Sequence, residues 1–101
     1  MQIIWSKLAE KDLDDVEQYI SQDNSIVAIN VVLTILNKVE LLPNNPAIGR
    51  TGRVMGTREL IVVGYPFIVA YRVKDNSIEV LRVLHTSQQF KKKKVLDSIR
   101  P

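Results

Sequence analysis

The feature that most constrains the fold is a series of three β-forming segments joined by very short connections. The segments run from Arg58 to Val63, from Phe67 to Val73 and from Ser77 to Leu84, and residues 64–66 ("GYP") and 74–76 ("KDN") separate them. Connections this short are typical of antiparallel hairpins, because parallel neighbours need a long crossover. The second half of the chain is therefore predicted to be an antiparallel meander.

The first half has the periodicity of helices. After a short apolar run at residues 3–5, Ser6 occupies an N-cap position, where its hydroxyl can accept a hydrogen bond from a backbone amide. The apolar stripe behind it consists of Ala9, Leu13, Val16 and Ile20. A second stripe follows the polar break "SQDNS" and consists of Ala28, Val32, Ile35, Val39 and Leu42, widened by Ile29, Leu33 and Leu36. These spacings predict a hairpin of two helices. Pro43 and Pro46 are expected to end the second helix.

Together the two halves predict an α+β fold with the order β-α-α-β-β-β in a single domain, residues 1–101. Because neither helical stripe can be buried within the hairpin alone, the hairpin is expected to pack on one face of a small, mainly antiparallel sheet. Trp5 and Tyr19 are expected in the core or at its edge. The segment after His85 is predicted to form either a short C-terminal helix or a loose tail.

Strand alternation does not decide which face of the sheet is the core. It divides the middle strand into two sets of side chains, Phe67, Val69, Tyr71 and Val73 on one side and Ile68, Ala70 and Arg72 on the other. Both sets contain apolar residues. By the same alternation, Arg82 and His85 are expected to point to opposite sides of the last strand.

The residue types argue against several classes of chemistry. The chain has no cysteine and a single histidine, and it lacks a glycine-rich phosphate loop, a G-x-S-x-G motif and a metal-spaced cluster of His, Asp and Glu. We therefore expect no disulfide, no metal site and no cofactor. No apolar run reaches about 18 residues, and the N-terminus turns acidic too early for a signal peptide. This pattern predicts a cytoplasmic protein without membrane attachment.

The net charge of +3 is unevenly distributed along the chain. Acidic residues gather between Lys7 and Asp23, three arginines and no acid lie between Arg50 and Arg58, and residues 91–94 are all lysine. Such asymmetry indicates surfaces with different partners. The arginines either belong to a solvated loop or surround a surface that binds an anionic or acidic partner.

His85 is the strongest single candidate for acid–base chemistry, since histidine titrates near neutral pH. A metal-free nuclease would need such a residue beside cations on the scissile phosphate, and Arg58, Arg72 and Arg82 are the arginines that could supply them. The simpler interpretation is a histidine at a strand end that hydrogen-bonds the backbone, with arginines on the solvated side of an antiparallel sheet. From the residues alone we favour the simpler interpretation.

Five segments match, in order and with similar spacing, a pattern known from one superfamily. They are "EKDLDDVEQYI" (residues 10–20), the proline-bearing break after the second helix, "GTRELIV" (56–62), "YPFIVAYRV" (65–73) and "IEVLRVLH" (78–85). On these segments the chain resembles the RelE/ParE superfamily of bacterial toxins over nearly its whole length. The resemblance implies the β-α-α-β-β-β fold and a toxin of a type II toxin–antitoxin module. It also implies a cognate antitoxin whose C-terminal segment wraps the toxin, with operator DNA bound only through that antitoxin.

The superfamily has two branches with different targets. RelE-like toxins are ribosome-dependent mRNA endonucleases, whereas ParE-like toxins inhibit DNA gyrase and are not nucleases. The nuclease branch places an arginine near Phe67 or Ile68, another near Ser87 and a tyrosine in the terminal segment. Here Phe67 and Ile68 are apolar and no tyrosine follows Tyr71, so the resemblance is closer to the ParE branch.

One departure from the ParE branch concerns the segment after His85. ParE-like chains often carry an arginine a few residues after this histidine, but here Gln88 and Gln89 occupy that stretch and lysine arrives only at Lys91. The residues that the resemblance predicts to bind the target or the antitoxin are Arg53, Arg58, His85, Gln89, Phe90 and Lys91.

Three functional hypotheses follow from the sequence. The leading one is a non-enzymatic inhibitor of DNA gyrase, with no catalytic residue. The alternative is a ribosome-associated mRNA endonuclease, for which the candidate catalytic residues are Arg58, Arg72, Arg82 and His85. The third is a toxin that has lost its activity and survives as a binding partner in an autoregulatory DNA-binding complex.

Overall fold

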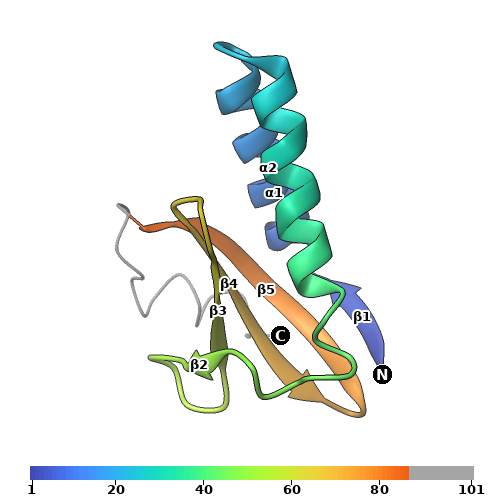
Figure 1. The fold of residues 1–101 in the computed structure, drawn as a ribbon. Helices are drawn as coiled ribbons and strands as arrows, with labels where there is room; N and C mark the ends of the chain where they lie inside the picture. The colour runs from blue at the N-terminus through green and yellow to red at the C-terminus, as the bar shows by residue number, and fades with distance from the viewer. Residues whose placement is uncertain (87–101) are drawn as a thin grey trace.

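The computed structural model describes residues 1–86, in which a helical hairpin packs on a five-stranded sheet (Figure 1). In chain order the elements are β1 (Gln2–Trp5), α1 (Lys7–Ser21), α2 (Ser25–Val39), β2 (Arg50–Thr51), β3 (Arg58–Val62), β4 (Phe67–Lys74) and β5 (Ser77–His85). The strand order is β1-β5-β4-β3-β2, with β1 and β5 parallel and all other neighbours antiparallel. The predicted α+β fold and mainly antiparallel sheet are confirmed.

The structure adds one short strand that the sequence does not predict. β2 lies in the connection between α2 and β3, and it pairs Arg50 with Glu59 and Thr51 with Arg58. Two residues are too few for the alternation of a strand to show in a sequence. The predicted hairpins of the meander are confirmed, and the second one turns tightly because Asp75 and Asn76 both adopt positive φ, 51° and 58°.

Ser6 joins the first strand to the first helix. Its hydroxyl accepts a hydrogen bond from the Ala9 amide (3.0 Å), which confirms the predicted N-cap, and donates to the Leu81 carbonyl oxygen (2.9 Å). The Ser6 amide donates to the Val80 carbonyl oxygen (3.0 Å). Helix α1 therefore begins against the edge of β5, at the point where β1 ends.

Both faces of the middle strand are buried, which explains why its sequence does not reveal the core face. The main core lies between the hairpin and one face of the sheet, and its sheet members are Leu60, Val62, Phe67, Val69, Tyr71, Ile78, Val80 and Val83. A smaller cluster lies on the opposite face and consists of Val54, Ile68, Ala70, Leu81 and Leu84. The alternation predicted for β4 is confirmed, and both sets of its side chains contribute to a core.

The predicted apolar face of α2 is partly wrong. The buried residues of the helix are Ala28, Val31, Ile35 and Val39. Ile29 and Leu33, which the sequence predicts to widen the buried stripe, are exposed, and so is Tyr19 of α1. The physical reason is visible in Figure 1, where the hairpin projects beyond the sheet, so that the sheet covers only one flank of it. A helix that is apolar around most of its circumference then keeps one flank in solvent.

Candidate functional site

Tyr71 and Arg58 hold the connection between α2 and β3 against the sheet. The buried Tyr71 hydroxyl donates to the Pro46 carbonyl oxygen (2.8 Å) and accepts a hydrogen bond from the Gly49 amide (3.0 Å). The Arg58 guanidinium donates to the carbonyl oxygens of Gly49 (2.8 Å) and Ala47 (3.4 Å). Arg58, a candidate both for catalysis and for partner binding, therefore has its charged group engaged by the backbone of its own chain.

Burial raises the pKa of Tyr71 above its ordinary value of 10.0, because a phenolate would lose its hydration in the core. The hydrogen bond from the Gly49 amide and the positive charge of Arg58 lower the pKa, and burial outweighs both. The folded protein therefore keeps a neutral phenol, whose O–H group can donate to Pro46.

Glu59 organises the connection between β2 and β3. Its buried carboxylate accepts hydrogen bonds from Nε and Nη2 of Arg50 (3.1 and 3.0 Å) and from the backbone amide of Arg53 (3.4 Å). A buried carboxylate is stabilised by donors of this kind and would be costly without them. The structure thus places Arg53, a predicted binding residue, at the start of a loop that Glu59 holds in shape.

The two remaining candidate arginines pair with carboxylates. Nε of Arg72 lies 2.9 Å from Glu79, its cross-strand neighbour. Arg82 donates to Asp12 of α1 through Nε and Nη2, at 2.7 and 2.8 Å, and the Val83 amide donates to the same carboxylate at 3.0 Å. Asp12 thus serves as a hydrogen-bond acceptor at the part of the β5 edge that β1 does not reach.

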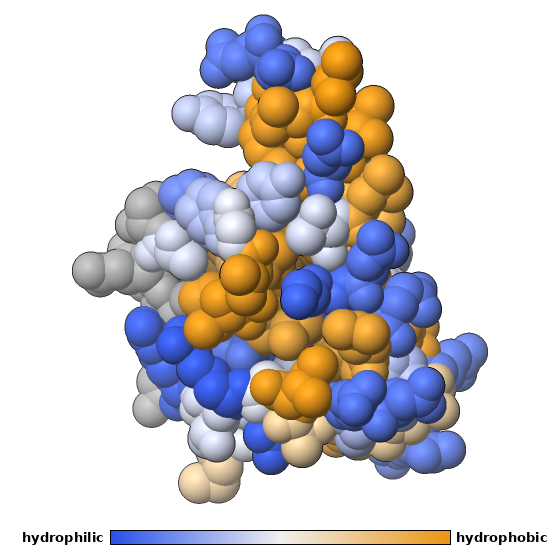
Figure 2. All heavy atoms as spheres, viewed as in Figure 1, coloured by the Kyte–Doolittle hydropathy of each residue, from blue (hydrophilic) through white to orange (hydrophobic). Residues whose placement is uncertain are grey.

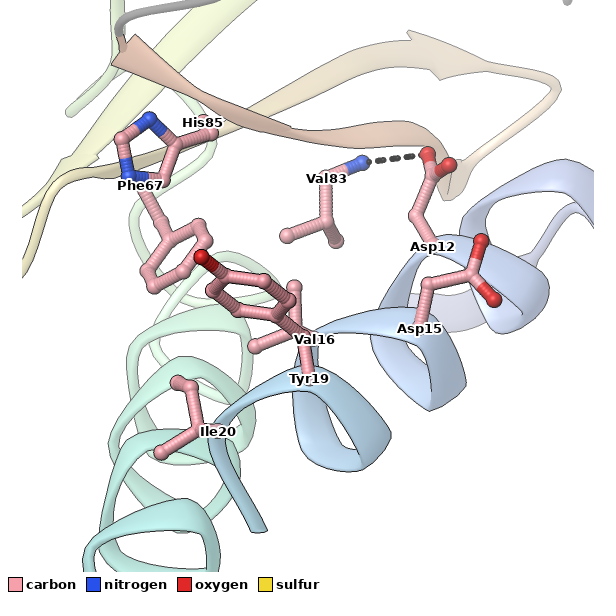
Figure 3. Close-up of a pocket in the computed structure, with 8 residues that line it drawn as sticks. All are labelled: Asp12, Asp15, Val16, Tyr19, Ile20, Phe67, Val83 and His85. Atoms are coloured by element: carbon pink, nitrogen blue, oxygen red, sulfur yellow. Dashed lines mark hydrogen bonds between the residues drawn. The ribbon is translucent and has the colours of Figure 1, made fainter. Parts of the chain in front are cut away.

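His85 lies at the end of β5, in a groove between α1 and the sheet (Figure 3). Its ring packs edge to face on Phe67, with ring centroids 5.3 Å apart and planes at 89°. The groove has a volume of about 600 Å³ and is lined by Asp12, Asp15, Val16, Tyr19, Ile20, Phe67, Val83 and His85. Figure 3 shows Tyr19 on the side of Phe67 and His85, with the two aspartates further toward the start of α1.

The charges of this groove do not suit a phosphate group. Its lining, within the described part of the chain, contains two carboxylates and no lysine or arginine. Asp12 is balanced by Arg82, and Asp15 pairs with Lys11 (3.0 Å) only on the exposed surface of the helix, where such a pair is weak. A partner segment that carries apolar and basic side chains would match the groove better than a nucleic acid backbone.

Two of the candidate catalytic arginines, Arg58 and Arg72, lie apart from His85, whereas Arg82 precedes it by three residues on β5 and pairs with Asp12 of the His85 groove. The strand register places His85 opposite Phe67, and Arg58 opposite Tyr71, which lies four residues further along β4. At a strand rise of about 3.3 Å per residue, this offset corresponds to about 13 Å. Arg72 lies one residue further from Phe67 still. Both arginines are engaged elsewhere, Arg58 by backbone carbonyls and Arg72 by Glu79, and neither lines the His85 groove.

Three of the predicted binding residues, Gln89, Phe90 and Lys91, lie outside the described residues, as does the expected C-terminal helix or tail. Within residues 1–86, no three or more His, Asp or Glu side chains gather as ligands of a metal ion would. Neither helix of this part of the chain is long and apolar enough to cross a membrane.

A second surface lies on the projecting part of the hairpin. Ile26, Ile29 and Leu33 are 71%, 55% and 50% exposed, and we call these three residues the α2 stripe. Their spacing places them on one flank of the helix, and Figure 2 shows apolar residues gathered along this part of the hairpin. The sequence predicts that Ile29 and Leu33 widen the buried stripe of α2. The signal that could have revealed the surface is the width of the apolar arc on α2, which exceeds what one sheet face can cover.

Comparison with known proteins identifies relatives over most of the chain. Residues 3–90 match the family model described as ParE toxin of type II toxin–antitoxin system, parDE. A Sinorhizobium fredii protein that bears the name of a candidate toxin, Y4kP, is 39% identical over 88 residues, which cover 87% of this chain and 91% of that protein. Toxin RelE2 of Caulobacter vibrioides is 29% identical over 87 residues, which cover 86% of this chain and 97% of that protein.

A solved structure agrees with these relatives. A chain of the chromosomal ParDE toxin–antitoxin system from P. aeruginosa superposes with a TM-score of 0.76 at 31% identity, covering 84% of this chain and 95% of that one. The helical hairpin on a mainly antiparallel sheet is thus the fold of a RelE/ParE-type toxin, which confirms the superfamily predicted from the sequence. Within that superfamily, the chain belongs to the ParE toxin family of type II toxin–antitoxin systems. An antitoxin partner follows from membership of such a system.

Proposed function

We propose that the protein arrests growth by binding and inhibiting DNA gyrase, without catalysing a reaction, and that its antitoxin prevents this binding. The observation that carries the proposal is the composition of the His85 groove, in which the described lining holds two carboxylates and no lysine or arginine. RNA cleavage without a metal requires positive groups on the scissile phosphate. Asp15, whose pair with Lys11 is exposed, would repel a phosphate there, and Arg82 already neutralises Asp12.

The pairing of the arginines supports the same proposal. Arg58 donates to backbone carbonyls, Arg72 pairs with Glu79, and Arg82 pairs with Asp12. A nuclease that used these arginines would have to break each contact before a phosphate could be bound. A gyrase target also fits a cytoplasmic location.

The α2 stripe and the His85 groove are the proposed binding surface of the antitoxin. Exposed apolar side chains that follow one flank of a helix are typical of a surface that a partner covers. The groove adds an apolar floor with carboxylates at its edge. We therefore expect the antitoxin to place apolar side chains on both regions and a basic side chain near Asp15. In this proposal the toxin makes no operator contact of its own, and the complex reaches DNA through the antitoxin.

The second candidate function is cleavage of mRNA on the ribosome. Two observations favour it: the likeness to the Caulobacter protein named RelE2, and the presence of His85 and Tyr19, two groups able to carry a proton, in one groove. A nuclease of this type would depend on His85, whereas a gyrase inhibitor would not use it as a proton carrier.

The experiment that separates the two functions compares the wild-type protein with His85→Ala in two assays. In a gyrase supercoiling assay, we expect both proteins to inhibit at similar concentrations, near one toxin per gyrase. In a translating ribosome mixture, we expect neither protein to cut mRNA. Cleavage of mRNA by the wild type that His85→Ala abolishes would overturn the proposal and establish the second candidate.

A further inference from the structure

Met55 is 96% exposed at the tip of the connection between β2 and β3, the highest exposure among the large apolar residues of the described part of the chain. Its neighbour Val54 points the other way and is buried in the cluster on the second face of the sheet. We call residues 52–57 the Met55 loop. Single exposed apolar residues are common on proteins, so the exposure of Met55 becomes informative only together with the rigidity and charge of the loop.

The Met55 loop is held in one conformation by its own hydrogen bonds. The Gly52 amide donates to the Thr57 carbonyl oxygen (2.8 Å), and the amide and hydroxyl of Thr57 donate to the Val54 carbonyl oxygen (3.1 and 2.6 Å). A side chain at position 52 would collide with the Thr57 hydroxyl. Gly56 adopts a φ of +82°, which favours glycine. The loop therefore presents Met55 from a fixed backbone.

The base of the loop carries positive charge. Residues 50–59 contain three arginines and one glutamate, a net charge of +2, and the carboxylate of Glu59 is buried among donors of the loop. The outward charge of this region is accordingly positive. Figure 1 shows the loop at the end of the molecule opposite to the tip of the helical hairpin.

We propose that the Met55 loop is a preformed contact element for the toxin's target, and that it inserts Met55 into an apolar socket bordered by carboxylates on a protein surface. A loop that is already ordered loses little conformational entropy on binding. The flexible thioether side chain of methionine adapts to the shape of a socket. The positive base of the loop matches an acidic surface and speeds the encounter with it.

The chemistry of the loop favours a protein over a nucleic acid. A loop that binds phosphates offers hydrogen-bond donors at its tip, whereas the tip here is an apolar thioether. At the base of the loop, Arg50 donates to Glu59, and Arg58 donates to the carbonyl oxygens of Gly49 and Ala47, so both guanidinium groups are engaged within the chain. The position of the loop, far from the α2 stripe, favours the target over the antitoxin as the partner. In naming a target contact, this inference rests on the proposed toxin function.

The test compares Met55→Ser with Val63→Ser, because Val63 is also an exposed apolar residue (74%) in a turn of the same sheet. Both variants should fold as the wild type does, since neither side chain is buried. Expressed without antitoxin, Met55→Ser should need at least tenfold more protein to arrest growth or to inhibit gyrase, and Val63→Ser less than twofold more. Met55→Leu should keep most of the activity, because it preserves an apolar side chain of similar size. Antitoxin affinity should be the same for all three variants.

Three outcomes would overturn the inference. Met55→Ser could arrest growth at the wild-type dose, it could lose antitoxin affinity in parallel with toxicity, or it could lose binding to nucleic acid instead of to a protein. The two assays also separate this inference from the proposed function. If the wild type arrested growth without inhibiting gyrase, the proposed target would be wrong, and the growth assay of Met55→Ser would still decide the role of the loop.

Discussion

At the end of the molecule formed by β2 and β3, polar side chains find their partners within the chain, whereas at the projecting tip of the helical hairpin apolar side chains have no cover. Tyr71, Arg58 and Glu59 each hold a connection in place through the backbone or another side chain. Among the described residues, no buried side-chain nitrogen or oxygen lacks a hydrogen-bond partner. The α2 stripe, in contrast, leaves three large aliphatic residues in solvent.

Polar side chains here serve the stability of the chain itself, whereas exposed apolar side chains, the α2 stripe and Met55 among them, are what it offers to partners. Charged residues that look functional in the sequence, above all the arginines, take part in stabilising the fold. Apolar residues that look structural in the sequence form the exposed surface.

The largest effect is expected from Asp12. Removing its carboxylate in Asp12→Ala leaves the partly buried Arg82 and the Val83 amide without this acceptor, which should lower the free energy of unfolding by about 3 kcal/mol. Asp15→Ala, three residues away on the same helix, breaks only an exposed pair with Lys11. It should change the free energy of unfolding by less than about 0.5 kcal/mol. Urea denaturation measures both, and equal effects would show that Asp12 does not fix α1 to the sheet.

A smaller effect is expected from Tyr71→Phe. The Gly49 amide and the Pro46 carbonyl oxygen lose their partner, which should cost about 2 kcal/mol at neutral pH.

The pH dependence of that loss gives a second readout. Because the pKa of Tyr71 is raised in the folded state, the unfolded chain loses this proton first, at about pH 10.0. The contribution of Tyr71 to stability is therefore complete below that pH and decreases as the pH rises toward the folded value. Denaturation at a series of alkaline pH values should show a shallower decline for Tyr71→Phe than for the wild type. Parallel declines would mean that another group causes the alkaline loss.

The smallest free-energy change is expected at the α2 stripe, and it should appear in binding rather than in stability. The double change Ile29→Ser and Leu33→Ser should weaken antitoxin binding at least tenfold, which is about 1.4 kcal/mol, and should leave unfolding nearly unchanged because both residues are exposed. Val27→Ser, on another flank of the same helix, serves as the control. Calorimetric titration with the antitoxin gives the affinities. An affinity equal to that of the wild type would place the antitoxin elsewhere.

The sequence predicts most of the fold because the helices and the longer strands each carry a local signal. The connections "GYP" and "KDN" define the meander, and Ser6 marks the start of α1. The two-residue strand β2 has no such signal. The sequence also does not indicate how much of α2 the sheet covers, because that depends on how far the hairpin projects. The apolar sequence of β4 could not reveal its core face because both faces are buried.

The candidate site was harder to predict, because the role of a charged residue depends on contacts that are distant in the chain. Arg82 meets Asp12 across 70 positions, and Arg58 meets carbonyls of a loop that precedes it. Sequence alone presents both arginines as candidate cations for a phosphate. The structure places His85 in a groove that the sequence does not indicate. Asp12, Asp15 and Tyr19 of α1 line the same groove.

The most direct test of the central claim examines both nucleic acids in cells that express the toxin without its antitoxin. Chromosomal DNA is probed for breaks linked covalently to gyrase, and the 5′ ends of translated mRNAs are mapped in the same cultures. The proposed function predicts gyrase-linked DNA breaks that accumulate with toxin dose, while mRNA stays uncut. New mRNA ends within translated codons, without gyrase-linked breaks, would contradict it.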